Sequence, residues 1–211
     1  MAALVSNRVC SMVMRKQSAI LSSVRHLSFS FAGPRSLDEI LKKELVEDKT
    51  KSELEDIWKS YHEEKQDTVA LVLSGEDGKN VTSRANQQPF FVQPIFRDNG
   101  FFMMVSQFQA PAYFLLAYLE DYKMDPHSAT PLLTFSVFND YATSKNLSLV
   151  RCDVWNKGVD TTEGRKVVQA LLDNYRVDEN FQSVKMFNEN PNTFDIDDYI
   201  SQMNERWNSS E

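Results

Sequence analysis

Residues 89–108, PFFVQPIFRDNGFFMMVSQF, consist of two apolar runs on either side of a central Asp-Asn-Gly. An Asn-Gly pair between strand-forming runs is the strongest short-range signal for a β-hairpin, because both residues tolerate the positive φ of a type I′ turn. With Asn99 and Gly100 at the centre of the turn, Phe96 should face Met103, whereas a three-residue loop would shift that register. The sequence therefore predicts a hairpin in the middle of the chain.

Both faces of this hairpin are apolar. A strand with one face in water alternates apolar and polar residues, and these runs barely alternate, so we expect a hairpin that is covered on both sides. Pro94 lacks an N–H group, which favours an edge strand or a bulge at that position. The simplest interpretation is that the hairpin is core. The alternative is that part of its apolar surface contacts another protein.

Two helices should precede the hairpin. Ser36 with Glu39, and Thr50 with Glu53, have the spacing of capping boxes, in which each side chain accepts a hydrogen bond from the other residue's backbone N–H. Apolar residues follow each box at helical spacing. Residues 36–65 are therefore predicted to form an amino-terminal helical pair with charged outer faces, acting as a cover for the sheet or as a mobile arm.

The remaining elements follow from apolar spacing and turn residues. Further strands are predicted at residues 68–73, 112–116, 131–138 and 147–154. Further helices are predicted at residues 74–88, 119–123 and 161–176, and from residue 195 onward. Residues 181–187 are ambiguous and are a candidate edge strand. Because strands are adjacent in the middle and helices lie at both ends, we predict a single α+β domain, with a mainly antiparallel β-sheet flanked by helices.

The first 33 residues have the composition of an organelle transit peptide. They contain four basic residues, seven serines and no acid. Residues 25–28, Arg-His-Leu-Ser, resemble a mitochondrial processing site. We therefore expect residues 1–33 to be a disordered mitochondrial transit peptide and residues 34–211 to form the folded domain in the mitochondrial matrix. A chloroplast is the alternative, since plant-type presequences look alike.

Charge and hydropathy narrow the class of partner. The chain has 23 Lys and Arg, of which four precede residue 34, and all 30 acids follow it, so residues 34–211 carry a net charge near −11. An acidic domain argues against a nucleic-acid partner, which requires a basic face. No apolar run approaches the ~18 residues of a membrane span, so we expect no stable membrane insertion.

A search for catalytic, cofactor or metal motifs finds none of the usual spacings. The six glycines are scattered, so no phosphate-binding Gly-rich loop can be written. His62 and His127 lack the spacing of a metal site, and Cys152 lies inside a predicted strand, as a small core residue does. The expectation is a domain that is not an enzyme, with no catalytic residue, cofactor or metal.

The chain resembles the mitochondrial ATP synthase assembly factors that chaperone the beta subunit of the catalytic head. The residues that carry the resemblance are Leu37-Asp38-Glu39-Ile40-Leu41, Glu44-Leu45, Ile57-Trp58-Lys59, Tyr61-His62, Pro89-Phe90-Phe91-Val92, Pro94, Gly100-Phe101, Gln107-Phe108, Leu119-Glu120, Tyr122-Lys123, Pro131-Leu132, Arg151, Phe187-Asn188, Pro191 and Phe194. One departure is Asn146, at a position where the family often has glycine.

The resemblance implies a chaperone that binds newly imported beta subunit before the alpha subunit arrives. Our candidate partner-binding residues are exposed members of the hairpin and of the segment after it, with the amino-terminal helical pair as a second surface. They are Gln107, Phe108, Tyr118, Leu119 and Tyr122. The alternative is a matrix enzyme or a small-ligand-binding α+β protein, which would show a deep pocket holding Cys152, His127 or a carboxylate cluster.

Overall fold

The computed structural model describes residues 34–155 and 158–209, so the predicted transit peptide lies outside the described residues. Six antiparallel strands form one sheet in the order β1-β6-β5-β4-β3-β2. The strands are β1 Thr68–Leu73, β2 Phe90–Arg97, β3 Gly100–Gln109, β4 Tyr113–Tyr118, β5 Pro131–Phe138 and β6 Ser148–Val154. The helices are α2 Lys51–Glu63, α3 Gly75–Gln87, α4 Leu119–Met124, α5 Thr161–Arg176, α6 Asp178–Glu189 and α7 Ile196–Ser209. The predicted α+β class with a helix-flanked antiparallel sheet is confirmed.

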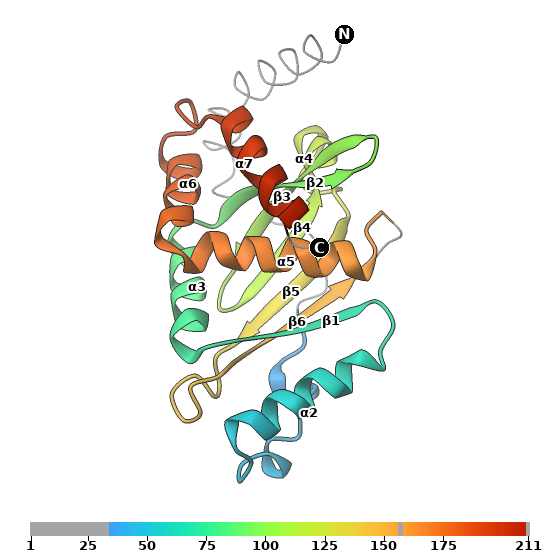
Figure 1. Cartoon of the computed structure of the whole chain (residues 1–211), viewed down its shortest axis with the longest axis vertical. Helices are drawn as coiled ribbons and strands as arrows, with labels where there is room; N and C mark the ends of the chain where they lie inside the picture. Colours follow the sequence, from blue (N-terminus) through green and yellow to red (C-terminus); the bar gives the residue numbers. More distant parts are fainter. Residues whose placement is uncertain (1–33, 156–157, 210–211) are drawn as a thin grey trace.

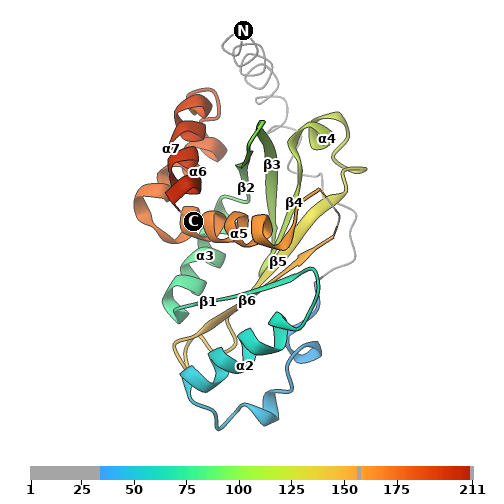
Figure 2. The same cartoon turned by 45° about the vertical axis from the view of Figure 1, so that its right-hand side comes forward.

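The helices divide between the two faces of the sheet. Figures 1 and 2 show α5 crossing one face, with α3, α6 and α7 grouped on the same side, while α2 lies apart from them beside β1. Side chains alternate along a strand, so β6 contributes Val150 and Cys152 to the large core under α5 and Leu149 to a smaller core. That smaller core contains Leu54 and Trp58 of α2.

The central hairpin is present, but its turn lies one residue earlier than predicted. Arg97 pairs with Gly100 and Phe96 pairs with Phe101, so the turn is formed by Asp98 and Asn99. Neither of these two residues has the positive φ of a type I′ turn, whereas Gly100 has a φ of 135°. The positive φ is therefore needed where the chain leaves the turn. Each residue of one strand therefore pairs with a residue two positions away from its predicted partner, as Phe96 does with Phe101 in place of Met103. Because side chains alternate with a period of two, every residue stays on its predicted face.

Coverage of the hairpin on both faces is confirmed near its base and ends at its tip. Phe91, Val92 and Met104 are at most 1% exposed, whereas Phe101 beside the turn is 51% exposed. Pro94 lies on β2, which is an edge strand of the sheet. The absent N–H of proline thus leaves no gap in the ladder between β2 and β3.

The prediction of a first helix in the amino-terminal pair is wrong. The capping box of Ser36 and Glu39 forms, but it starts a single 3₁₀ turn, η2 Leu37–Glu39, and a second one follows at η3 Lys43–Leu45. The chain bends between them because Leu37 and Val46 both enter the small core under α2, leaving Leu45 69% exposed. A straight helix would have placed Leu45 inward with Leu37.

The candidate edge strand at residues 181–187 is also wrong, because this segment lies within α6. Phe181, Val184 and Phe187 recur every three residues, and the last two are buried. A short apolar run of this kind does not distinguish a strand from a buried helix by periodicity alone.

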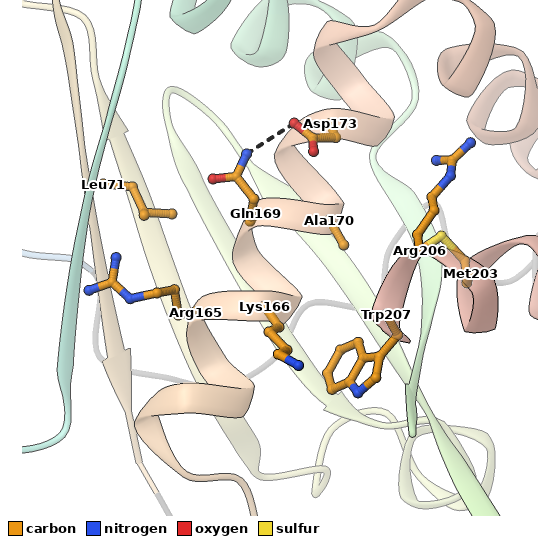
Figure 3. Close-up of a pocket in the computed structure, with 9 residues that line it drawn as sticks. All are labelled: Leu71, Arg165, Lys166, Gln169, Ala170, Asp173, Met203, Arg206 and Trp207. Atoms are coloured by element: carbon orange, nitrogen blue, oxygen red, sulfur yellow. Dashed lines mark hydrogen bonds between the residues drawn. The ribbon is translucent and has the colours of Figure 1, made fainter. Parts of the chain in front are cut away.

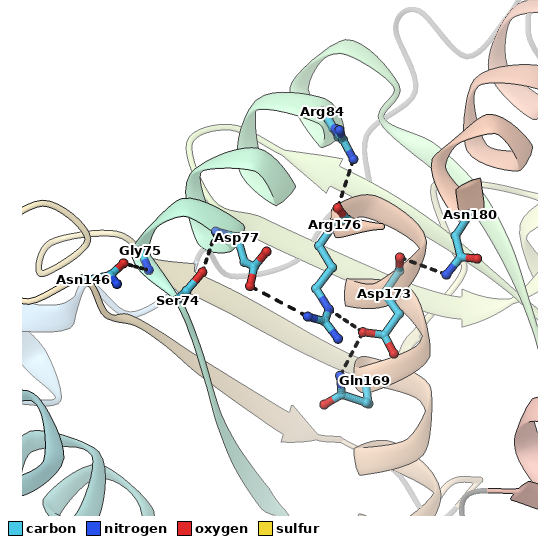
Figure 4. A network of polar contacts seen from close by, with 9 residues as sticks. All are labelled: Ser74, Gly75, Asp77, Arg84, Asn146, Gln169, Asp173, Arg176 and Asn180. Carbon is cyan, nitrogen blue, oxygen red and sulfur yellow. Dashed lines mark hydrogen bonds and ion pairs between the residues drawn. The ribbon is translucent and has the colours of Figure 1, made fainter. Parts of the chain in front are cut away.

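A polar network joins α3 to the end of α5 (Figure 4). The Nε of Arg176 donates to Asp173 at 2.6 Å, and its Nη1 lies 3.8 Å from Asp77 of α3. Arg84 of α3 donates to the carbonyl oxygens of Tyr175 and Arg176, at 2.9 and 3.2 Å. These carbonyls have no partner inside a helix that ends there. The network therefore holds α3 against the carboxyl-terminal end of α5.

The start of α3 lies against the loop that precedes β6. Asn146 has a φ of 49°, a conformation that glycine adopts freely and that asparagine tolerates better than most residues. Its side-chain oxygen accepts a hydrogen bond from the N–H of Gly75 at 3.0 Å. A Cβ on Gly75 would lie 2.1 Å from the carbonyl oxygen of Ala142. Gly75 is thus required by a close approach of two backbone segments.

Replacement of Gly75 by alanine should destabilise the protein, although alanine favours helices. In a solvent-exposed helix, replacing glycine by alanine would raise the free energy of unfolding by up to about 1 kcal/mol. Here the backbone contact with Ala142 forces a shift, which costs about 1–3 kcal/mol of unfolding free energy, as overpacking does. Urea denaturation of Gly75→Ala measures this loss of unfolding free energy. Ser83→Ala, on the exposed face of α3, is the control. Equal or greater stability of Gly75→Ala would show that the loop moves away at no cost.

Candidate functional site

The structure places most of the predicted partner-binding residues in the interior. Gln107, Phe108, Leu119 and Tyr122 are all buried, and Tyr118 is half-buried. The exposure that we expected is wrong for these four, because β4 and α4 lie against β3. Burial also raises the pKa of the Tyr122 phenol to about 12. Contact of these residues with a partner stays a prediction.

Other aromatic side chains are exposed instead, and Phe101 and Trp155 are the most exposed of those in the described residues. Phe101 is 51% exposed at the tip of the hairpin, where its ring lies 5.8 Å from that of Phe96. Trp155 is 52% exposed just after β6, and its Nε1 donates to the Thr134 hydroxyl at 2.8 Å. The exposure of Phe101 could have been predicted from the sequence, since this residue adjoins the predicted turn. The exposure of Trp155 was harder to predict, because it depends on where strand β6 ends.

Trp155 borders a hollow of about 390 Å³ on the sheet face opposite α5. Its lining includes Tyr113, Thr134, Arg151 and Asp153. Arg151 and Asp153 form the ion pair that their shared strand face suggested, with the closest nitrogen and oxygen 2.6 Å apart. This pair neutralises itself, and Arg35 adds a positive charge to the lining, so the hollow offers a mixed polar and aromatic surface that is weakly basic.

The residues named for possible chemistry lie in three separate places. Cys152 faces the large core, and burial raises the pKa of its thiol, which suppresses the reactive thiolate. His127 lies in the loop after α4, where its backbone N–H donates to Asp125. His62 belongs to α2 and is 1% exposed, and its Nδ1 lies 2.7 Å from the Trp58 carbonyl oxygen. Within residues 34–155 and 158–209, no three His, Cys, Asp or Glu side chains gather as metal ligands do.

His62 should make stability depend on pH. Burial is the main cause that lowers the pKa of His62 below its ordinary value of 6.5. The unfolded chain therefore binds the proton first, so the free energy of unfolding should fall as pH drops below about 6.5, by at most about 1.4 kcal/mol per pH unit. Denaturation of wild type and His62→Gln between pH 7.5 and 5.5 tests this. Parallel curves for the two proteins would contradict the assignment.

A groove of about 360 Å³ lies between β1, α5 and α7 (Figure 3). It combines apolar side chains with basic ones, and its lining is Leu71, Arg165, Lys166, Gln169, Ala170, Asp173, Met203, Arg206 and Trp207. The Nζ of Lys166 lies 5.4 Å from the centre of the Trp207 ring. Within the described residues, neither Arg165 nor Lys166 forms an ion pair. In an acidic protein, this groove is a local basic region.

The two edges of the sheet differ in how they are covered. On β2, the Asn188 side chain accepts from the N–H of Phe90 at 3.2 Å and donates to its carbonyl oxygen at 2.6 Å. The Tyr199 hydroxyl donates to the Val92 carbonyl oxygen at 3.2 Å, and Pro94 has no N–H. Side chains from α6 and α7 thus occupy this edge. The edge of β1 lies beside the basic groove.

Aromatic side chains are enriched in protein–protein interfaces, and an exposed sheet edge is a surface to which extended segments of other proteins can add. Residues 12–200 match the profile described as ATP11 protein, and the chain belongs to this family. None of the helices in the described part of the chain is long and apolar enough to cross a membrane.

The chain is similar to proteins named as ATP synthase mitochondrial F1 complex assembly factor 1. It is 23% identical to the one from Danio rerio over 78% of this chain and 54% of the relative. It is 24% identical to the one from Mus musculus over 84% of this chain and 55% of the relative. A protein from Schizosaccharomyces pombe, named Protein atp11, mitochondrial, is 26% identical over 68% of this chain and 52% of the relative. The chain thus spans about half the length of these relatives.

Proposed function

We propose that this protein is a mitochondrial chaperone that binds the unassembled beta subunit of ATP synthase and promotes assembly of the soluble catalytic head. The observation that carries the proposal is the family match over residues 12–200, supported by relatives named as F1 complex assembly factors. These names describe assembly factors and not enzymes.

The physical requirement for such a chaperone comes from its partner. Subunit contacts in an obligate complex are large and apolar, so an isolated subunit exposes surface that aggregates. A protein that covers this surface lowers the concentration of the aggregating form by mass action. It must also bind more weakly than the alpha subunit does in the finished head, so that alpha displaces it. Neither step requires ATP hydrolysis by the chaperone.

The proposed location is the mitochondrial matrix. The Arg- and Ser-rich, acid-free residues 1–33 support import, and the relatives carry mitochondrial names. The acidic domain fits a protein that stays soluble beside an aggregating partner. Exposed Phe101 and Trp155 are proposed contacts, and the predicted Gln107, Phe108, Tyr118, Leu119 and Tyr122 would contact the partner only where the chain around them opens.

An aggregation assay tests the proposed function. Purified beta subunit is diluted from denaturant with and without the full chain, and light scattering is followed over time. The chain should suppress scattering at roughly equimolar concentration, as a stoichiometric binder does. Bovine serum albumin at the same concentration is the control for nonspecific coating. Scattering that is unchanged by the full chain would refute the proposal.

A further inference from the structure

The free edge of β1 has a row of main-chain groups that point away from the sheet. In an antiparallel ladder, alternate residues direct both their N–H and C=O toward the neighbouring strand. The N–H of Val154 on β6 donates to the Asp67 carbonyl oxygen at 2.8 Å, which fixes the phase of the alternation. Thr68, Ala70 and Val72 therefore direct their main-chain groups outward.

One contact confirms this phase. Arg165 of α5 donates through Nη1 to the Ala70 carbonyl oxygen at 3.3 Å, from the side away from β6. Among the described residues, this is the one hydrogen bond to the outward groups of Thr68, Ala70 and Val72. The edge of β1 thus differs from that of β2, where side chains of α6 and α7 and a proline block pairing. Unblocked edges readily pair with another chain.

The outward edge runs along a channel between two helices. Figures 1 and 2 show β1 passing between α5 and α2. On the α5 side lies the groove of about 360 Å³ that contains Leu71 and Trp207. On the α2 side lies a hollow of about 220 Å³ lined by residues that include Lys59, His62 and Val72. Both hollows include Leu71 and Arg165, so they adjoin at the strand.

We propose that this edge binds an extended segment of the unassembled partner as an additional β-strand beside β1. The proposal rests on the proposed function, since it names the binding mode for the beta subunit. Side chains of an added strand would alternate between the two hollows. Those facing α5 would meet Leu71, Ala170 and Trp207.

The charge of the channel specifies the segment further. Arg165 and Lys166 have no carboxylate partner among the described residues, and they lie beside the apolar lining of the α5 groove. The segment that fits is therefore extended, with apolar residues at alternate positions and a carboxylate beside them. A backbone N–H of the segment would donate to the Ala70 carbonyl oxygen in place of Arg165. The Arg165 guanidinium would then be free to pair with the carboxylate of the segment.

A pair of substitutions at Val72 separates the main-chain contact from the side chain. Val72→Pro and Val72→Ala both lose the isopropyl group, but proline alone removes the outward N–H, which does not take part in the β1–β6 ladder. Affinity for purified beta subunit is measured by biolayer interferometry, after thermal melting shows that both variants are folded. The proline variant should bind about tenfold more weakly than the alanine variant, as expected for a lost main-chain hydrogen bond and a blocked approach. Equal affinity of the two variants would overturn the proposal.

Hydrogen exchange on the wild-type chain keeps the test decisive if the proline variant does not fold. Addition of beta subunit should slow exchange at the amides of Thr68, Ala70 and Val72, because they gain partners. The amides of Val69 and Leu71 already bond to β6 and should change much less. Uniform protection, or none, would contradict strand addition.

The same measurements distinguish this proposal from the proposed function. Binding of beta subunit without alternating protection at β1 would overturn strand addition and leave the chaperone function standing. No binding of beta subunit by the wild-type chain would overturn both. Alternating protection that appears with rising concentration of the chain alone would show that a second copy occupies the edge, and it would overturn the assignment to the partner.

Discussion

Replacement of Phe91 by alanine should lower the free energy of unfolding by about 3–5 kcal/mol, the range for a large aromatic side chain removed from a packed core. Phe91 is fully buried on the edge strand β2. Its ring centre lies 5.7 Å from that of Phe187 on α6, 6.1 Å from that of Phe194, and 5.1 Å from that of Tyr199 on α7. The loss of this ring removes aromatic contacts that pack both carboxyl-terminal helices against the sheet, beside the hydrogen bonds of Asn188 and Tyr199 to β2.

Phe101→Ala is the matched control for this prediction. Phe101 belongs to the same hairpin and loses the same atoms, but it is 51% exposed, so its removal should change stability by about 0.5 kcal/mol or less. Chemical denaturation followed by circular dichroism measures both variants. Similar losses for the two phenylalanines would mean that the aromatic cluster around Phe91 does not dock α6 and α7.

Trp58→Ala should have an effect of similar size, about 3–5 kcal/mol, through the smaller core. Trp58 is 1% exposed on α2, and its Nε1 donates to the Val150 carbonyl oxygen at 3.1 Å. Its ring also meets the edge of Phe138, at 6.1 Å between centres. Since Trp58 joins α2 to the sheet, its loss should also free the helix that forms one wall of the β1 channel.

Tyr61→Ala on the same helix is the control, because Tyr61 is 45% exposed. Hydrogen exchange adds a local measurement: in Trp58→Ala, the amides of α2 should exchange faster than those of α5. If α2 stays as protected as in the wild type, other contacts hold it and the role assigned to Trp58 is wrong.

The central hairpin shows how much of the fold follows from the sequence. Apolar runs around Asn99 and Gly100 were sufficient to predict the two strands and their faces. The position of the turn was not predictable, because it depends on which residue takes the positive φ, and here Gly100 takes it after the turn. Helix α5 was predicted correctly from the helical spacing of its apolar residues, and the structure shows that Asp160 caps it by accepting from the N–H of Glu163.

The segments that were predicted wrongly are those whose neighbours decide their conformation. Residues 36–45 have a helical period, yet Leu37 and Val46 are drawn into the core under α2, so the segment bends. Phe108 was expected at the surface, but it packs against Phe114 of the next strand, with 4.8 Å between ring centres. A sequence pattern gives the face of a residue and not what covers that face.

The proposed binding edge could not be predicted from the sequence, for a related reason. Residues 68–73, TVALVL, have the composition of a buried strand, and the order of strands in the sheet is what places them at an edge. The phase of the ladder, which directs Thr68, Ala70 and Val72 outward, depends on pairing with β6. Both facts require tertiary structure.

The most direct test of the account is the equilibrium affinity of the full chain for isolated beta subunit, compared with isolated alpha subunit under the same conditions. We expect binding to beta that is at least about tenfold tighter than binding to alpha, and release of the chain when alpha is added to the complex. Equal affinity for the two subunits, or no binding to beta, would contradict the account.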